Sequence, residues 1–287
     1  MKSIVKHSSR KAAFTIIELL TVMSIIVILI GLLVPSLNMA RRFAKKLTQK
    51  NQLRIIGIGI EFFNNEWDGY PPSSAFDGSG QQYCGAMKLT EAMVGKDLLG
   101  FHPDSAFRAD GLDTTGRLLY DPVTLGARKE LFLQLDNANV NMLSEIYGPG
   151  NTGSFNENNF VLCDIYRRDM RSGRKTGMPV LYYKAETSNK LHDPNFVATA
   201  TDNNGNIYNF NDNQAIFALG KPWEDTGNAS TISLSSPTRF YRNTRNDKIS
   251  TLRRPYKTDS YILISAGFDG EYGTADDICN FEWKYRE

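Results

Sequence analysis

The sequence predicts an α+β fold in which a long N-terminal helix packs on a small antiparallel β-sheet headgroup, with an elaborated αβ loop region between them. Phe14–Val34 carries a single charged residue, so the first half of the helix is apolar. After Pro35, apolar residues recur at helical spacing as far as Phe63. Near the C-terminal end, β-branched and aromatic residues alternate with a period of two, which indicates strands.

Composition excludes two classes of function. The 287 residues carry a net charge of only +2, which provides no concentrated basic surface, so we expect no nucleic-acid partner. The three cysteines are widely spaced and form no CxxC pair, which disfavours a zinc site. Cys84, Cys163 and Cys279 are consistent with two alternatives. They form one disulfide with one thiol left over, or they are three small buried apolar side chains.

The N-terminal segment has the length and flanks of a membrane-spanning helix. Residues 1–13 are basic and contain no acid. A helix over the apolar residues that follow spans about 30 Å, the thickness of a bilayer core. The leading cluster orients the start of the helix towards the cytoplasm, although a second basic cluster follows the far end at Arg41, Arg42, Lys45 and Lys46.

Glu18 is unexpected in such a helix, because a carboxylate in hydrocarbon costs roughly 2 kcal/mol or more. A cleaved secretory signal has a shorter apolar core without a carboxylate, and a plain single-pass anchor does not need one. The simplest alternative is that the Glu18 side chain extends to the membrane–water interface, where its carboxylate stays hydrated. A specific partner for Glu18 is the interpretation that explains its position.

The stretch "AFTIIELLTVMSIIVILIGLLVPSL" resembles the N-terminal segment of type IV pilins and of the pseudopilins of type II secretion. The resemblance implies that a prepilin peptidase cuts between Ala13 and Phe14 and methylates the new terminal amine of Phe14. Glu18 is then the fifth residue of the mature chain, and Pro35 lies where members of the family often have a helix-kinking proline. Ala13 departs from the glycine that usually precedes the cut.

This resemblance implies a filament subunit rather than an enzyme. The amine of Phe14 would pair with Glu18 of a neighbouring subunit, neutralising both charges and fixing the axial register. The implied partners are other pilin or pseudopilin subunits in a homo- or heteropolymer, the peptidase, an assembly platform protein and an ATPase. The implied location is the inner membrane, with an extracytoplasmic or periplasmic headgroup, and then the filament. The alternative is an extracytoplasmic binding or enzymatic domain on a single-pass anchor.

Five regions follow from these patterns: a leader peptide (1–13), a transmembrane and assembly helix (14–35), its amphipathic continuation (36–70), a variable αβ loop region (71–176) and a β-sheet region (177–287). The turn residues of "DGYPP" end the long helix.

The variable region shows weaker periodicity. We expect short helices within residues 91–101 and 128–148, and strands within 159–167 and 177–185. Asn204-Gly205 is a hairpin-turn signal.

An acidic loop follows the last long strand, "SYILISA". Asp269, Asp276 and Asp277 lie close together in a glycine-rich stretch, where they would repel one another unless a cation joined them. Such a set suits calcium, which prefers six to eight oxygen ligands. An exposed Asp- and Gly-rich turn explains the same residues without a metal.

The sequence "SAGFDGEYGTADDICN" resembles the calcium-binding C-terminal loop of the major pseudopilins. The resemblance implies side-chain ligation of calcium by the three aspartates, with carbonyl ligands around Ser265 and Gly267 and from the turn at residues 273–274. The chain between the two family-like ends is longer than in a compact major pseudopilin.

No enzymatic motif appears. His7, His102 and His192 are the three histidines, and none is spaced for metal binding or for a nucleophile. The chain has no GxSxG nucleophile elbow, Walker A or GxGxxG pattern. We therefore expect no enzymatic activity.

Overall fold

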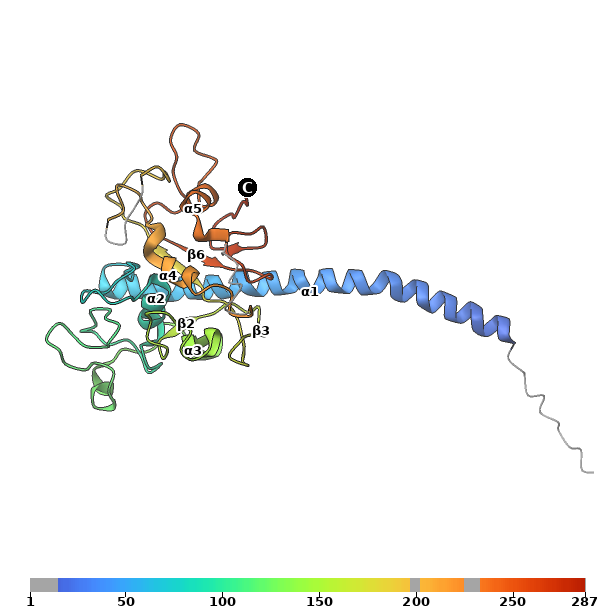
Figure 1. Ribbon diagram of the computed structural model, residues 1–287, viewed down its shortest axis with the longest axis horizontal. Coiled ribbons are helices and arrows are strands. Elements are labelled where there is room, and N and C mark those ends of the chain that lie inside the picture. Colours follow the sequence, from blue (N-terminus) through green and yellow to red (C-terminus); the bar gives the residue numbers. More distant parts are fainter. Residues whose placement is uncertain (1–14, 197–201, 225–232, 287) are drawn as a thin grey trace, which may run out of the picture. The chain divides into compact units, whose positions relative to one another are not determined.

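A computed structural model describes residues 15–196, 202–224 and 233–286. The predicted leader, and the cleavage-site residues Ala13 and Phe14, lie outside the described residues. The chain divides into two compact units, Met1–Ala44 and Lys45–Glu287 (Figure 1). Everything from the middle of the long helix to the C-terminus therefore belongs to one folded unit, which we call the headgroup.

Helix α1 extends from Ile16 to Trp67 and confirms the predicted long N-terminal helix. Pro35 lies inside it. The helix ends where the turn chemistry predicted, because Asp68 adopts a left-handed φ of 50° that no helix can continue.

The main sheet contains β5 (Leu181–Lys184), β6 (Tyr261–Ser265) and β7 (Ile278–Cys279), in that order and antiparallel. In this register Leu181 lies opposite Ile264. These elements establish an α+β fold with small antiparallel sheets.

Side chains of β6 alternate between two cores. Leu263 packs with Ile56 and Ile60 of α1 on one face of the sheet. Ile264 belongs to a second core with Phe240 on the opposite face. This period of two is what a strand buried on both faces requires, so the second half of α1 covers one face and the C-terminal helices cover the other.

Helix α2 (Gly85–Val94) is buried along its whole length. Leu89 and Met93 contribute to the core against α1, whereas Ala86 and Met87 contribute to the other core. A buried helix must satisfy its polar side chains internally, and the carboxylate of its one acid, Glu91, accepts hydrogen bonds from three hydroxyl groups, those of Tyr83, Ser105 and Tyr120.

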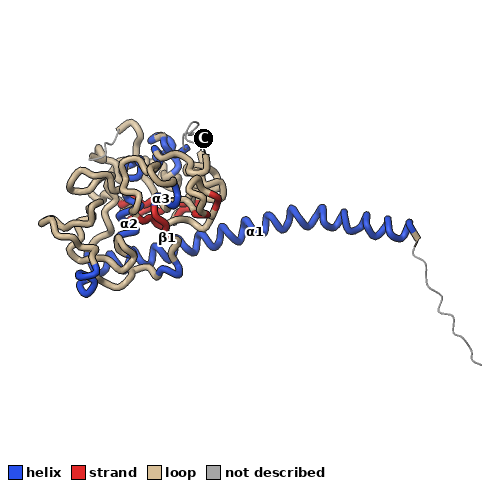
Figure 2. The backbone as a smooth tube through the Cα atoms, turned by 60° about the horizontal axis from the view of Figure 1, so that its bottom comes forward, coloured by secondary structure: helices blue, strands red, loops and turns tan. Residues whose placement is uncertain are grey.

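The remaining elements are short, and Figure 2 shows the strands at the centre of the headgroup with loops wrapped around them. Two further sheets have two strands each: β1 (Val140–Met142) pairs with β2 (Phe160–Leu162), and β3 (Arg168–Asp169) pairs with β4 (Lys175–Thr176). The short α-helices are α3 (Leu143–Tyr147), α4 (Gln214–Ala218) and α5 (Pro237–Asn243).

Both strand predictions in the middle of the chain are confirmed in shortened form by β2 and β5. The short helices predicted within 128–148 form in part, as α3 and as a 3-10 turn at Leu135–Asn137. Long-range hydrogen bonds hold the residues around that turn out of a continuous helix: the amide of Leu133 donates to the carbonyl of Met93, and the amide of Cys163 donates to that of Asn139. These long-range bonds outweigh local helix propensity.

One further local prediction is corrected, and another is confirmed in part. The helix expected within residues 91–101 begins earlier and ends at Val94, because Gly95 adopts a positive φ of 80°. Asn204 and Gly205 form a turn with positive φ at both positions, but no strands flank it among the described residues. All three cysteines are free and buried, which matches the second of the two alternatives for them.

Two buried glutamines fasten α1 to the segment after β2. The Gln52 side-chain amide donates to the Cys163 carbonyl over 2.9 Å, and the Gln49 side-chain oxygen accepts from the Ile165 amide over 2.9 Å. Backbone groups beyond the end of a short strand thus find partners on a helix more than 100 residues away in the sequence.

We predict that Gly59→Ala destabilises the headgroup. A Cβ at position 59 would lie 2.8 Å from the carbonyl oxygen of Phe132 and 3.0 Å from the sulfur of Met93. Overpacking of this kind costs about 1–3 kcal/mol, more than the roughly 1 kcal/mol that alanine gains over glycine in a helix. Thermal unfolding monitored by circular dichroism measures the effect.

Gly126→Ala is the matched control, because a Cβ at position 126 would meet no atom within 4 Å. An unchanged melting temperature for Gly59→Ala would contradict the close approach of α1 to this loop.

Candidate functional sites: the start of helix α1 and the acidic loop

The first half of α1 exposes large apolar side chains all round. Leu20, Ile28 and Leu33 each have more than half of their surface exposed, and none of the residues in the most apolar 18-residue window of the helix is buried. By length and composition α1 is the one helix, among the described residues, that is able to cross a membrane, although a signal sequence would pass the same test. An apolar surface of this extent marks a segment that functions against lipid or protein.

At the start of α1, Glu18 and Thr15 form a reciprocal capping box. The Glu18 carboxylate accepts from the Thr15 amide and from its hydroxyl, both over 2.8 Å. The Glu18 amide donates to the Thr15 hydroxyl over 3.2 Å. This arrangement satisfies two backbone donors that the first turn of a helix leaves unpaired.

Sequence reasoning missed this cap, although its signal is present as "TIIE", a threonine three residues before an acid at the start of an apolar run. Glu18 therefore has a local structural role besides any role between subunits. The predicted partner of the carboxylate, the amine of Phe14, lies outside the described residues, so that pairing stays a prediction.

The acidic loop begins directly after β6. Gly267 has a positive φ of 68°, and a Cβ there would lie 2.3 Å from the carbonyl oxygen of Asp276, so the two sides of the loop touch. The Asp276 carboxylate accepts from the Asp269 amide over 2.9 Å and from the Thr274 hydroxyl over 2.8 Å. The structure thus brings together two of the three predicted aspartates, Asp269 and Asp276.

The third aspartate, Asp277, is used differently. It is buried, and its carboxylate accepts from the backbone amides of Gly273 and Thr274 over 2.7 and 3.3 Å. Burial raises the pKa of Asp277, and these amides oppose that shift. Ser265 is one of the residues whose backbone carbonyl is predicted to ligate calcium. It is buried at the end of β6, where its hydroxyl donates to Asp164 over 3.1 Å.

Two neighbouring carboxylates in a half-buried loop cannot both ionise freely. Burial raises the pKa of Asp269 to about 6, and the adjacent Asp276 adds to the rise. Burial also acts to raise the pKa of Asp276, but hydrogen bonds from the Asp269 amide and the Thr274 hydroxyl outweigh it and hold that pKa below its ordinary value. Without a cation, Asp269 is therefore the carboxyl group of the two that is harder to ionise.

Arg168 contributes positive charge beside the loop. Its guanidinium donates to the Phe268 carbonyl over 2.6 Å and lies over the ring of Trp223, with its central carbon 4.1 Å from the ring centroid. Sequence reasoning did not find this arginine, because it lies 100 residues before Phe268 in the chain.

These residues fit a calcium ion in part. Asp269 and Asp276 are hard oxygen donors of the kind calcium prefers, but Asp277 is bonded to backbone amides and Arg168 already supplies a cation. Among the described residues, no group of three or more His, Cys, Asp or Glu side chains is arranged to hold a metal ion. Occupation by calcium stays a prediction.

Comparison with known proteins found no matching family model, no matching curated protein and no matching solved structure.

We predict that Asp269→Asn stabilises the calcium-free protein more at pH 7.5 than at pH 5. The folded-state pKa of Asp269, about 6, lies above the unfolded value near 4. The favourable contribution of the protonated form is complete below pH 4 and is lost as the pH rises through 6. Melting temperatures of both proteins in chelator, at several pH values, measure the difference. A difference that does not vary with pH would contradict the close contact of Asp269 with Asp276.

Proposed function

We propose that the protein is a structural subunit of a filament of the type IV pilus or type II secretion pseudopilus kind. One observation carries the proposal: the first half of α1 is apolar on every side, has no buried residue in its most apolar window, and carries a single carboxylate at its start. Such a helix is expected to lie in a bilayer before assembly and among other helices afterwards.

The position of Glu18 supports assembly rather than simple anchoring. A single-pass anchor gains nothing from a carboxylate in its first turn beyond a helix cap, which an uncharged glutamine would also provide. In a filament, the carboxylate would meet the amine that leader cleavage creates on Phe14 of a neighbouring subunit. A charge pair of this kind acts mainly through specificity, because each charge is costly in an apolar core without the other.

The headgroup supports the same proposal through its use of α1. The second half of the helix supplies one side of a core against a three-stranded antiparallel sheet, so one helix belongs both to an apolar segment and to a folded headgroup. The proposal places this unit outside the inner membrane, with the prepilin peptidase, a platform protein and an assembly ATPase as partners of the N-terminal segment.

We predict that charge, and not helix capping, at Glu18 is needed for assembly. Glu18→Gln keeps an acceptor for Thr15 but removes the charge, and both it and Glu18→Ala are expected to reduce filament incorporation at least tenfold. Thr15→Ala removes the hydroxyl half of the capping box but keeps the carboxylate, and it is expected to assemble. Shear fractionation and immunoblotting measure incorporation, and membrane fractionation checks that all three variants insert.

The mature wild-type chain should begin at N-methylated Phe14 by mass spectrometry. An intact Met1, or normal filaments from Glu18→Gln, would favour the alternative, an extracytoplasmic domain on a single-pass anchor.

We propose in addition that the acidic loop binds calcium through Asp269 and Asp276, and that the ion stabilises the end of the sheet. The support is the convergence of two carboxylates whose mutual repulsion a cation would relieve. The calcium would hold the two sides of the loop together at the point where Gly267 already touches Asp276.

We predict that calcium raises the melting temperature of the purified protein relative to chelator, because a ligand that binds only the folded state stabilises it. Asp276→Asn should abolish the increase. The matched control is Asp136→Asn, which removes an exposed carboxylate elsewhere on the headgroup and should leave the increase intact. Equal melting temperatures with calcium and with chelator would contradict calcium binding by this loop.

A further inference from the structure

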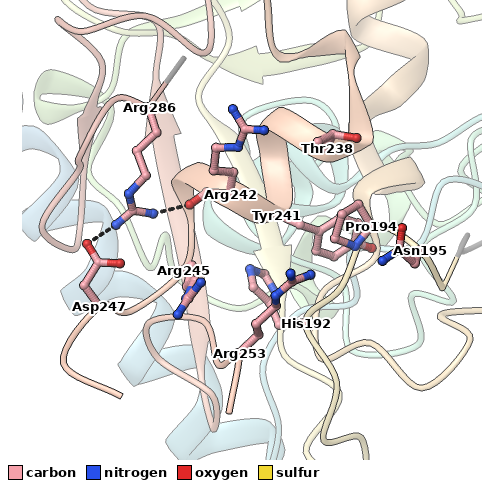
Figure 3. Close-up of a pocket in the computed structure, with 10 residues that line it drawn as sticks. All are labelled: His192, Pro194, Asn195, Thr238, Tyr241, Arg242, Arg245, Asp247, Arg253 and Arg286. Carbon is pink, nitrogen blue, oxygen red and sulfur yellow. Dashed lines mark hydrogen bonds and ion pairs between the residues drawn. The ribbon is translucent and has the colours of Figure 1, made fainter. Parts of the chain in front are cut away.

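A cavity of about 320 Å³ lies beside α5, between that helix and the segments around His192, Asp247 and Arg253. Figure 3 shows the residues that line it. The volume lies at the lower end of the range of small-molecule sites. These residues belong to the predicted β-sheet region (177–287), for which the sequence indicated no site outside the acidic loop.

The lining is strongly basic. Four arginines, Arg242, Arg245, Arg253 and Arg286, come from three separate segments of the chain and meet at one cavity. Asp247 is the one acid in the lining, and it pairs with Arg286 (Figure 3). A concentration of guanidinium groups in a concave site attracts anions.

The nearby acids do not neutralise this cluster. Arg253 pairs with Asp193 over 2.9 Å, and the Arg286 guanidinium is held by Asp247 and by the carbonyl of Arg242. The side chain of Arg245 makes no hydrogen bond or ion pair within the described parts of the chain, and its buried Nε has no partner. Arg245 is therefore a positive charge in the cavity wall that is available to a ligand.

His192 supplies a second group without a partner, which is a hydrogen-bond acceptor whereas Arg245 is a donor. The Thr244 hydroxyl donates to the Phe240 carbonyl over 2.7 Å, so it accepts, over 3.0 Å, the proton carried by Nε2 of His192. Nδ1 is consequently a bare acceptor. It is buried and has no partner among the described residues, on a side chain that is 1% exposed.

Protonation of Nδ1 does not remove the need for a donor, because the charged form of His192 is unfavourable in this position. Burial lowers the pKa of His192 to about 3; the backbone of Tyr241 opposes this shift, and the nearby Arg245 adds to it. Near neutral pH His192 therefore has an uncharged acceptor without a donor, and Arg245, which lines the same cavity, has a guanidinium without a partner among the described residues. A buried acceptor without a donor is costly, so a donor from a ligand is expected to occupy that position.

The guanidinium of Arg245 and Nδ1 of His192 together indicate which chemical groups a ligand of this cavity carries. Arg245 can pair with an anionic oxygen, and Nδ1 of His192 can accept a hydroxyl hydrogen from the same molecule. Chloride or acetate supplies only the first of these groups, and a neutral sugar supplies only the second. We propose that this cavity binds an anionic sugar, with its carboxylate or phosphate on Arg245 and a ring hydroxyl donating to His192.

A sugar that carries its charge on a carboxylate and one that carries it on a phosphate offer the same two groups. Their sources differ, because the first occurs in acidic polysaccharides and the second in phosphorylated metabolites and glycans. Glucuronate and glucose 6-phosphate are suitable probes for the two sources, and glucose and acetate each lack one of the two groups.

The test is titration calorimetry on the full chain in a polyoxyethylene detergent, which has no sugar headgroup to compete for the site. At least one charged sugar is expected to bind at least tenfold more tightly than glucose or acetate. Arg245→Gln is expected to weaken that binding at least tenfold, since a charge-assisted hydrogen bond is lost. The matched control, Lys248→Gln, removes an exposed positive charge that does not line the cavity and should leave binding unchanged.

A second readout tests the role of His192 without altering a buried residue. In ¹⁵N spectra of the ring nitrogens, the Nδ1 signal of His192 should move as the charged sugar donates to it, whereas that of His102, whose Nδ1 already accepts from the Asp104 amide, should not. Three outcomes would each overturn the proposal: acetate binding as tightly as both charged sugars, binding that Arg245→Gln does not change, or an unmoved His192 signal at saturation.

Discussion

Water cannot cover the first half of helix α1 at an acceptable free energy, and this constraint governs the rest of the molecule. Every turn from Ile16 to Val34 exposes apolar side chains, so the segment needs lipid or other apolar helices around it. The headgroup therefore has to fold without that segment. It does so by building both of its cores from residues after Lys45, with the second half of α1 covering one face of the sheet.

Charge placement in the chain follows from the same constraint. The single carboxylate of the apolar segment lies in its first turn, where a capping box with Thr15 satisfies it locally and where a positive chain end could reach it. In the headgroup, charges are instead arranged in pairs and clusters. Asp269 and Asp276 compete for ionisation beside Arg168, and a group of arginines around His192 leaves one guanidinium without a partner among the described residues.

The sequence alone could determine features that depend on neighbours along the chain. Helix α1 and its end at Asp68 follow from spacing and turn chemistry, and strands β5 and β6 follow from alternation that both cores then require. The acidic loop could be recognised because its three aspartates lie within one short stretch. The capping box of Thr15 and Glu18 was equally local, and its motif was present in the sequence although it was not recognised.

Only the tertiary structure decided the features that join distant segments. Residues 128–142 form no continuous α-helix, and within this stretch the amide of Leu133 bonds to α2 and the carbonyl of Asn139 to the amide of Cys163, which no local pattern reveals. Arg168 comes to lie beside an acidic loop 100 residues away, and four arginines scattered between positions 242 and 286 meet His192 at one cavity. The physical reason is the same in each case: a local pattern fixes which face of an element is apolar, but the partners of its polar groups are set by how the elements pack.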